Sequence, residues 1–181
     1  MAKSICAKCS RQLADNKWLP RSIEEYRQTV LARFGGDPIE AENKLYPVFS
    51  NVAYNLQYLE YINKCFEELY LTSVIRAQNV KMFTLTTSQI IECMLYVKLI
   101  EMGADNRDIW DFQSNIRVAT DKNAFGLGPN FYRGEMRWLK DLRNRVHIQS
   151  PAEIAEAAYA VFEKLEVLNR SKSILWHFLQ K

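Results

Sequence analysis

The sequence predicts an all-α fold, an up-and-down bundle of about five to seven helices joined by short loops. Turn-forming residues are scarce: the 181 residues include 6 glycines and 5 prolines, whereas a β-sandwich or barrel needs such residues every few positions. Apolar residues recur at three- and four-residue steps, and no strict alternation is long enough to predict a strand. We divide the chain into an N-terminal arm (1–21), a helical extension (22–47) and the bundle itself (48–181).

Charge and hydropathy narrow the class of protein. The chain has 24 Lys and Arg against 21 Asp and Glu, a formal net charge of +3, which by itself does not indicate a nucleic-acid partner. With 48% hydrophobic and 25% charged residues, the composition excludes a disordered tail and a disulfide-rich secreted scaffold. No apolar run approaches the ~18–20 residues of a membrane span, and residues 1–10 lack the apolar stretch of a signal peptide. We therefore expect a cytoplasmic protein without membrane contact.

The N-terminal half begins with a helix that has clear start and stop signals. Residues 22–25 have the pattern of a capping box, and the helix they open is expected to end at Gly35. Pro38 restarts a short helix, which Pro47 breaks or kinks. Residues 48–80 carry the longest helical pattern in the chain.

The C-terminal half is expected to contain a buried helix followed by a basic one. Thr86 offers an N-cap for a helix that is apolar over much of its circumference, as expected of a central helix. Two glycines and a proline between residues 121 and 130 indicate a loop. The expected elements are a helix over 86–101, a helix over 107–120, a loop over 121–130, a basic helix over 131–147, and a long final helix that starts with a capping box at Ser150 and breaks near 169–171.

The cysteines argue against a metal site. Cys6 and Cys9 form a CxxC pair, but a structural zinc site uses four ligands, usually from two such pairs. Cys65 and Cys93 are isolated within apolar helical patterns, which is typical of core thiols. A thioredoxin-like role for the CxxC pair would need a βαβ context, which the pattern lacks. We expect no metal and no cofactor, with Cys6 and Cys9 as weak candidates for a metal.

The strongest chemical signal is a basic segment in the C-terminal half. Between residues 133 and 145 the chain carries five basic and two acidic residues, a local charge of +3 that equals the net charge of the whole chain. The alternative to a functional surface is an ordinary solvated helix face. The basic residues are Arg133, Arg137, Lys140, Arg143 and Arg145, and the acidic residues are Glu135 and Asp141.

A histidine follows this segment at a helical spacing. Arg143 and His147 are four residues apart, so in a helix both project from one face, with Asn144 beside them. An imidazole that titrates near neutrality beside a guanidinium is suited to move protons at a phosphodiester while charge on its oxygens is stabilised. The alternative is a solvated histidine that favours the dipole at the end of its helix.

The stretch Leu142-Arg143-Asn144-Arg145-Val146-His147, followed by a capped long helix, resembles the HEPN superfamily of small helical domains. Their shared motif is an Arg, often followed by Asn or another polar residue, and then a His. The order of elements over residues 48–170 is also similar, including a buried helix that carries Glu92. The family's usual pattern places more residues between Arg and His than the three found here.

The resemblance implies a function for the basic segment. HEPN domains typically dimerise so that two copies of the motif face one cleft, and many are metal-independent ribonucleases of toxin–antitoxin, antiviral and RNA-processing systems. Arg143 and His147 would then be the catalytic pair and Asn144 a supporting residue, with RNA, a second copy of the chain and an antitoxin or other regulatory protein as partners. The residues expected to bind RNA are Arg133, Arg137, Lys140 and Arg145.

Two other functions compete with the nuclease. Some HEPN domains lack catalysis, so the chain could be an RNA- or protein-binding regulatory module. A further alternative is a helical protein-binding domain that uses its aromatic-rich N-terminal half, although aromatic side chains at such spacings are typical of amphipathic cores and dimer edges. These aromatic residues are Tyr46, Phe49, Tyr54, Tyr58, Tyr61 and Tyr70.

Overall fold

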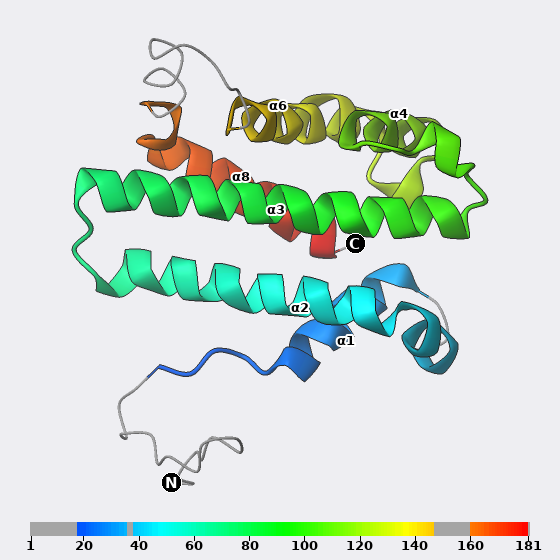
Figure 1. Cartoon of the computed structure of the whole chain (residues 1–181), viewed down its shortest axis with the longest axis horizontal. Helices are drawn as coiled ribbons and strands as arrows, with labels where there is room; N and C mark the ends of the chain where they lie inside the picture. The colour runs from blue at the N-terminus through cyan, green and yellow to red at the C-terminus, as the bar shows by residue number, and fades with distance from the viewer. Residues whose placement is uncertain (1–17, 36–37, 147–159, 181) are drawn as a thin grey trace, which may run out of the picture.

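The computed structural model describes residues 18–35, 38–146 and 160–180. Every regular element within these ranges is helical and none is a strand, which confirms the predicted all-α class. Figure 1 shows α3 across the middle of the molecule, with α2 on one side, α4 and α6 on the other, and α8 behind it. The main helices are α1 (Ile23–Phe34), α2 (Pro38–Glu68), α3 (Ser73–Glu101), α4 (Phe112–Lys122), α6 (Arg137–Val146) and α8 (Leu165–Gln180).

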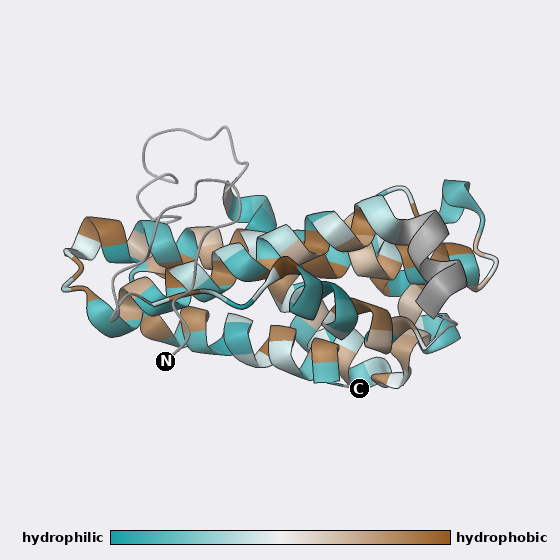
Figure 2. Cartoon of the chain, turned by 90° about the horizontal axis from the view of Figure 1, so that it is seen from below, coloured by the Kyte–Doolittle hydropathy of each residue, from teal (hydrophilic) through white to brown (hydrophobic). Residues whose placement is uncertain are grey.

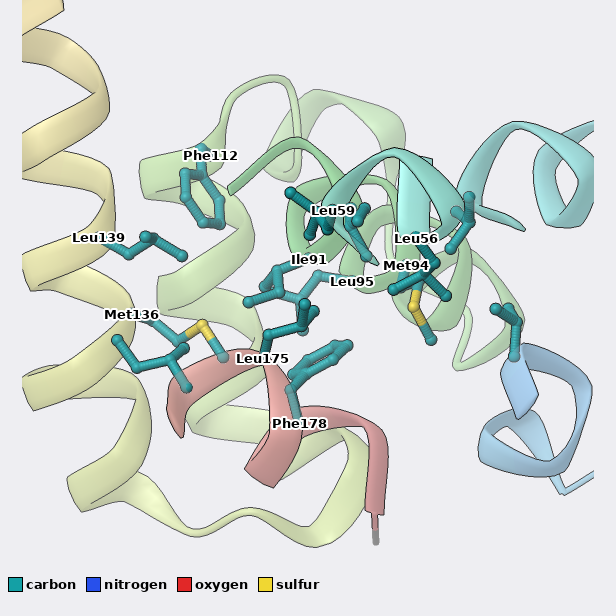
Figure 3. Close-up of a cluster of buried hydrophobic side chains, with 14 of the residues drawn as sticks. Leu56, Leu59, Ile91, Met94, Leu95, Phe112, Met136, Leu139, Leu175 and Phe178 are labelled. Carbon is teal, nitrogen blue, oxygen red and sulfur yellow. The ribbon is translucent and has the colours of Figure 1, made fainter. Parts of the chain in front are cut away.

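The core surrounds α3 because this helix has neighbours on several sides. Its apolar side chains point in more than one direction, so α3 buries residues toward α2, toward α8 and toward the pair formed by α4 and α6. Figure 3 shows side chains from these helices meeting in one cluster. The cluster includes Leu56 and Leu59 of α2, Ile91, Met94 and Leu95 of α3, Phe112 of α4, Leu139 of α6, and Leu175 and Phe178 of α8.

Most of the long helices carry apolar and polar residues on different faces, whereas α3 is apolar over much of its circumference. In Figure 2, hydrophobic and hydrophilic segments alternate along them, as expected of helices that turn one face to a core and the other to solvent. Within the described ranges, no helix combines the length and the apolar character that crossing a membrane requires.

The capping signals of α1 are confirmed. The Ser22 hydroxyl accepts a hydrogen bond from the Glu25 amide at 3.2 Å, and the Glu25 carboxylate accepts one from the Ser22 amide at 2.7 Å. The helix ends at Gly35, whose φ of 67° lies in the left-handed region that favours glycine. Both predicted ends of this helix are therefore correct.

Of the two effects expected of Pro47, a break or a kink, the break is wrong. Pro47 lies inside α2, which continues from Pro38 to Glu68, so the predicted boundary between residues 47 and 48 falls within one helix. A proline removes one backbone donor and strains the preceding turn. The turns that follow it pack against α1 and α3, and this tertiary packing outweighs the local preference.

The predicted helix over 48–80 is divided, and the predicted start at Thr86 is wrong. The chain turns at residues 69–72, which contain neither Gly nor Pro, and α3 begins at Ser73. Two hydroxyl residues near position 86 donate hydrogen bonds to carbonyls of the preceding turn and so fit within α3, whereas the buried Thr87 hydroxyl has no partner among the described residues. The Thr84 hydroxyl donates to the Val80 carbonyl at 2.9 Å, and the Ser88 hydroxyl donates to the Leu85 carbonyl at 2.7 Å.

The segments around α4 are less regular than predicted. The helix expected over 107–120 begins only at Phe112, because Asp111 caps it and accepts from the Ser114 amide at 2.6 Å. The expected loop at 121–130 contains short turns. The basic helix then opens with a π-helical segment, η3 (Tyr132–Met136), before α6.

The predicted break near 169–171 is also wrong. α8 passes through these residues, and the interruption lies earlier, at residues 163–164. Ser171 is buried, and its hydroxyl lies 3.0 Å from the hydroxyl of Thr84 in α3. This polar contact lets a serine occupy the interface between α3 and α8. The capping box predicted at Ser150 lies outside the described residues.

Arg33 joins three distant parts of the chain. Its Nε donates to the carbonyl of Phe178 at 2.6 Å, and Nη2 donates to the carbonyl of Phe125 at 2.9 Å. Phe178 lies in the last turn of α8, where carbonyls lack a helical donor and a positive charge is favourable. Phe125 has a left-handed φ of 58°, so this buried arginine supports a backbone conformation that is uncommon for a residue with a side chain.

We predict that Arg33→Met lowers the free energy of unfolding by about 2–3 kcal/mol, because it retains the apolar stem but leaves two carbonyls without their charged donor. Urea denaturation measures this change. Arg117→Ala, which removes an exposed arginine of α4, is the control and should change stability by less than about 0.5 kcal/mol. Equal effects of the two substitutions would contradict the structural role of Arg33.

Candidate functional site

Arg143 occupies the last turn of α6, beside the apolar side chains with which this helix packs against the core. Leu139 and Leu142 are buried, and Figure 3 shows Leu139 extending toward Ile91 of α3. Arg143 lies next to these apolar side chains, so its side chain runs along the edge of the core and is 26% exposed. Its guanidinium carbon lies 5.7 Å from the centre of the Phe112 ring.

An ion pair with Glu92 orients the Arg143 guanidinium. Nη1 of Arg143 lies 2.7 Å from Oε2 of Glu92, whose side chain is 24% exposed. Glu92 projects from α3, an otherwise largely apolar helix, and the two residues are far apart in sequence. The signal for this contact in the sequence is the carboxylate within a buried helix, but sequence alone did not pair it with Arg143.

The other predicted site residues have different surroundings. Asn144 and Arg145 are exposed. Arg145 follows Arg143 by two residues, so it projects roughly 200° around the helix from it. His147 lies outside the described residues.

The remaining basic residues extend the surface away from Arg143. Arg133 and Arg137 are exposed. Lys140 donates to the Gln113 side chain at 2.7 Å and pairs with Asp141 at 3.0 Å. Arg137, Lys140 and Asn144 follow one another at three- and four-residue steps, so they share one stripe of α6.

One acidic residue of the basic segment is neutralised from another helix. Arg170 of α8 donates two hydrogen bonds to the Glu135 carboxylate, at 2.9 and 3.2 Å. Its guanidinium also lies 4.3 Å from the centre of the Trp138 ring. Because Arg170 neutralises Glu135, this carboxylate offsets less of the positive charge of residues 133–145 than the count of five basic and two acidic residues implies.

A cavity of about 480 Å³ adjoins the Glu92–Arg143 pair. Glu92 is part of its wall, and Arg143 reaches this wall through the ion pair. The rest of the lining comes from α3, from the segment that leads into α4 and from α4 itself. Sequence reasoning did not identify this cavity. The principal lining residues are Glu92, Cys93, Tyr96, Trp110, Asp111 and Asn115.

A second cavity has a volume of about 790 Å³. Most of its lining residues belong to α2 and α8, and they include both apolar residues and polar ones such as Lys172. Burial lowers the pKa of Lys172. Tyr26 also lines it, and burial together with a hydrogen bond to Glu60 raises the pKa of Tyr26 to about 12. This cavity has no basic cluster beside it comparable to α6.

The described residues provide no evidence for a metal centre. They contain no group of three or more His, Cys, Asp or Glu side chains arranged to hold an ion. Cys65 is buried, as predicted for a core thiol, and Cys93 is partly buried, which raises its pKa. Cys6 and Cys9 lie outside the described residues.

Comparison with known proteins adds no assignment. No family model, no curated protein and no solved structure matches this chain.

We predict a coupling energy of about 1 kcal/mol between Glu92 and Arg143 in a double-mutant cycle with Glu92→Ala and Arg143→Ala, because both side chains are largely shielded from solvent. The free energies of unfolding of the four proteins give this value. The control cycle uses Asp105 and Arg107, whose side chains are 45% and 89% exposed, and should give a smaller coupling. A coupling near zero for Glu92 and Arg143 would show that the ion pair does not orient Arg143.

Proposed function

We propose that this chain is a HEPN-type, metal-independent endoribonuclease that acts on RNA as a homodimer in a toxin–antitoxin or antiviral system. The observation that carries the proposal is the placement of Arg143 at the end of a basic helix, where it is held by Glu92, a residue that lines a cavity. The motif in residues 142–147 supports the family, and the exposed arginines of the same segment support a polyanionic substrate.

The environment of Arg143 suits phosphate binding. A guanidinium carries five N–H donors in a fixed fork, so the contact between Nη1 and Glu92 does not exhaust it. The carboxylate fixes the direction of the fork before substrate arrives, and a donor held in place costs little reorganisation when charge develops. Arg137 and Lys140, on the adjoining stripe of α6, would contact phosphates farther along the strand.

The proposed chemistry is an internal transfer that only RNA can undergo. The 2′-hydroxyl attacks the adjacent phosphorus, and His147 accepts its proton. Arg143 stabilises the charge on the non-bridging oxygens as the bond to the 5′-oxygen breaks. The products are a 2′,3′-cyclic phosphate and a 5′-hydroxyl, whose oxygen takes up a proton. DNA lacks the 2′-hydroxyl and should resist cleavage.

A non-catalytic RNA- or protein-binding module is the second candidate. It is favoured by exposed tyrosines on α2, where Tyr58 and Tyr61 stack with ring centres 6.5 Å apart and Tyr54 is exposed on the same helix. Exposed aromatic side chains provide contact area for a partner at little entropic cost. Binding of RNA without cleavage by the unaltered protein would favour this function over the nuclease.

We predict that His147→Ala and Arg143→Ala each reduce cleavage of single-stranded RNA in EDTA by about 100-fold or more, because each removes a group that acts on the reacting phosphate. Gel analysis of end-labelled RNA measures the rate, and thermal melting verifies the fold. Arg143→Lys retains the charge but loses the fork, so it should also be impaired. Arg21→Ala, on the α1 side of the molecule, is the control. Full activity in either of the first two variants would remove the proposed role of that residue.

We also predict that affinity for short single-stranded RNA falls as salt rises, with a logarithmic slope of about −0.7 for each phosphate contacted. Arg137→Ala should lower the magnitude of this slope by about that amount, because it removes one such contact. Fluorescence anisotropy from low to high salt measures the slope. Lys64→Ala on α2 removes a charge outside the basic segment and should leave the slope unchanged. If the unaltered protein, Arg137→Ala and Lys64→Ala all gave the same slope, Arg137 would not contact the RNA.

A further inference from the structure

The cavity beside Arg143 contains a polar group for which the fold provides no partner. Asn115 of α4 is 2% exposed and lines this cavity. Its Oδ1 is buried and accepts no hydrogen bond from any residue that the structure describes. A buried acceptor without a donor destabilises the folded protein unless a donor is supplied. An external ligand with an N–H group in the cavity would supply that donor.

Two aromatic side chains accompany Asn115. Trp110 is 77% exposed, an unusual position for the largest apolar side chain, and Tyr96 is 42% exposed. The Tyr96 hydroxyl donates to the Asn106 side chain at 3.3 Å, which holds it at the edge of the cavity. Exposed aromatic rings are the surfaces on which unpaired bases of single-stranded nucleic acids stack.

The charged groups that line the cavity are both carboxylates, those of Asp111 and Glu92. Asp111 accepts from the Ser114 amide at 2.6 Å, and Glu92 pairs with Arg143 at 2.7 Å. Each carboxylate has about four lone-pair sites, so these contacts leave acceptor capacity. The amides in the same wall can both donate and accept, and they belong to Gln89, Asn106 and Asn115. The two carboxylates, which only accept, favour a ligand edge that carries a donor.

We propose that this cavity is the base-recognition subsite for a nucleotide next to the scissile phosphate, and that it selects a base with an exocyclic amino group over uracil. The base stacks on Trp110, and its amino group donates to Asn115 and the neighbouring carboxylates. Arg143 then meets the phosphate of the same strand, because Glu92 belongs both to the cavity wall and to the ion pair. This inference rests on the proposed function, since it assumes that RNA reaches Arg143.

The volume of the cavity is compatible with this ligand. At about 480 Å³ it falls in the range of ~300–1,000 Å³ typical of small-molecule sites. Stacking alone does not discriminate strongly between bases, because every base has a π-face. Selectivity therefore comes from the acceptors, and affinity comes mainly from Trp110.

The test compares cleavage of four single-stranded RNAs that differ only in the base beside the cut site. We expect the unaltered protein to cleave the adenine, cytosine and guanine substrates with a higher kcat/KM than the uracil substrate. Trp110→Ala should raise KM about tenfold, the loss expected for one stacked base, whereas Trp110→Phe retains a ring and most of the affinity. Asn115→Leu should narrow the difference between uracil and the other bases, with thermal melting to verify folding.

The control is Trp176→Ala, which removes another exposed tryptophan, on α8 and lining the other cavity. It should leave both KM and base preference unchanged. Cleavage that is the same in Trp110→Ala and the unaltered protein would overturn the subsite while the nuclease function stands.

A binding measurement separates failure of the subsite from failure of the proposed function. Titration with AMP, CMP, GMP and UMP is followed by tryptophan fluorescence, using Trp110→Phe to identify the signal of Trp110. If RNA is not cleaved but AMP, CMP or GMP quenches Trp110 more strongly than UMP does, the subsite stands and the nuclease function falls. If no nucleotide affects Trp110 and no RNA is cleaved, both are overturned.

Discussion

The ion pair between Glu92 and Arg143 determines the candidate site, because it connects the central helix to the basic helix at the edge of the core. Its two side chains are each about one quarter exposed, so neither charge loses all of its hydration. A fully buried pair would incur a large desolvation cost, and a fully exposed one would hold neither side chain in place. The intermediate position allows the pair to orient a guanidinium that remains in contact with solvent.

The position of the pair depends mainly on apolar packing. Leu139 and Leu142 are buried against the core, and they determine which way α6 is turned about its axis. Arg143 follows Leu142 and therefore emerges at the boundary between core and solvent. Phe112 of α4 lies beneath its guanidinium. Three helices thus cooperate to place one charged group, and none of them could do so alone.

Local sequence signals predicted helix ends that depend on neighbouring residues. They failed at helix ends that are determined by contacts between residues far apart in the chain. Ser22 and Glu25 are three residues apart, so their capping box was visible in the sequence. Pro47 and Thr86 look like helix boundaries, but the packing of α2 and α3 carries both helices past them. The turn at 69–72 has no Gly or Pro to mark it.

The same distinction applies to the candidate site. Arg143 and the basic segment could be singled out from the sequence because their charges lie close together in the chain. The partnership with Glu92 spans two helices, and the cavity is built from α3, the segment leading into α4 and α4 itself, so neither has a local signature. The unpartnered oxygen of Asn115 is also invisible to sequence, since whether an amide finds a donor depends on the packed structure.

The charges of the basic helix divide into two roles. Glu92 neutralises much of the charge of Arg143. In the proposed function, Arg143 would therefore contribute less to attracting RNA from a distance than to holding it after it binds. Long-range attraction falls to the exposed arginines, and Arg170 strengthens it by neutralising Glu135. Salt screens exposed charges much more than shielded ones. Added salt should therefore slow the association of RNA with the basic helix more than it disturbs the orientation of Arg143. The reason is that the arginines that attract RNA are exposed, whereas the pair between Arg143 and Glu92 is partly shielded at the edge of the core.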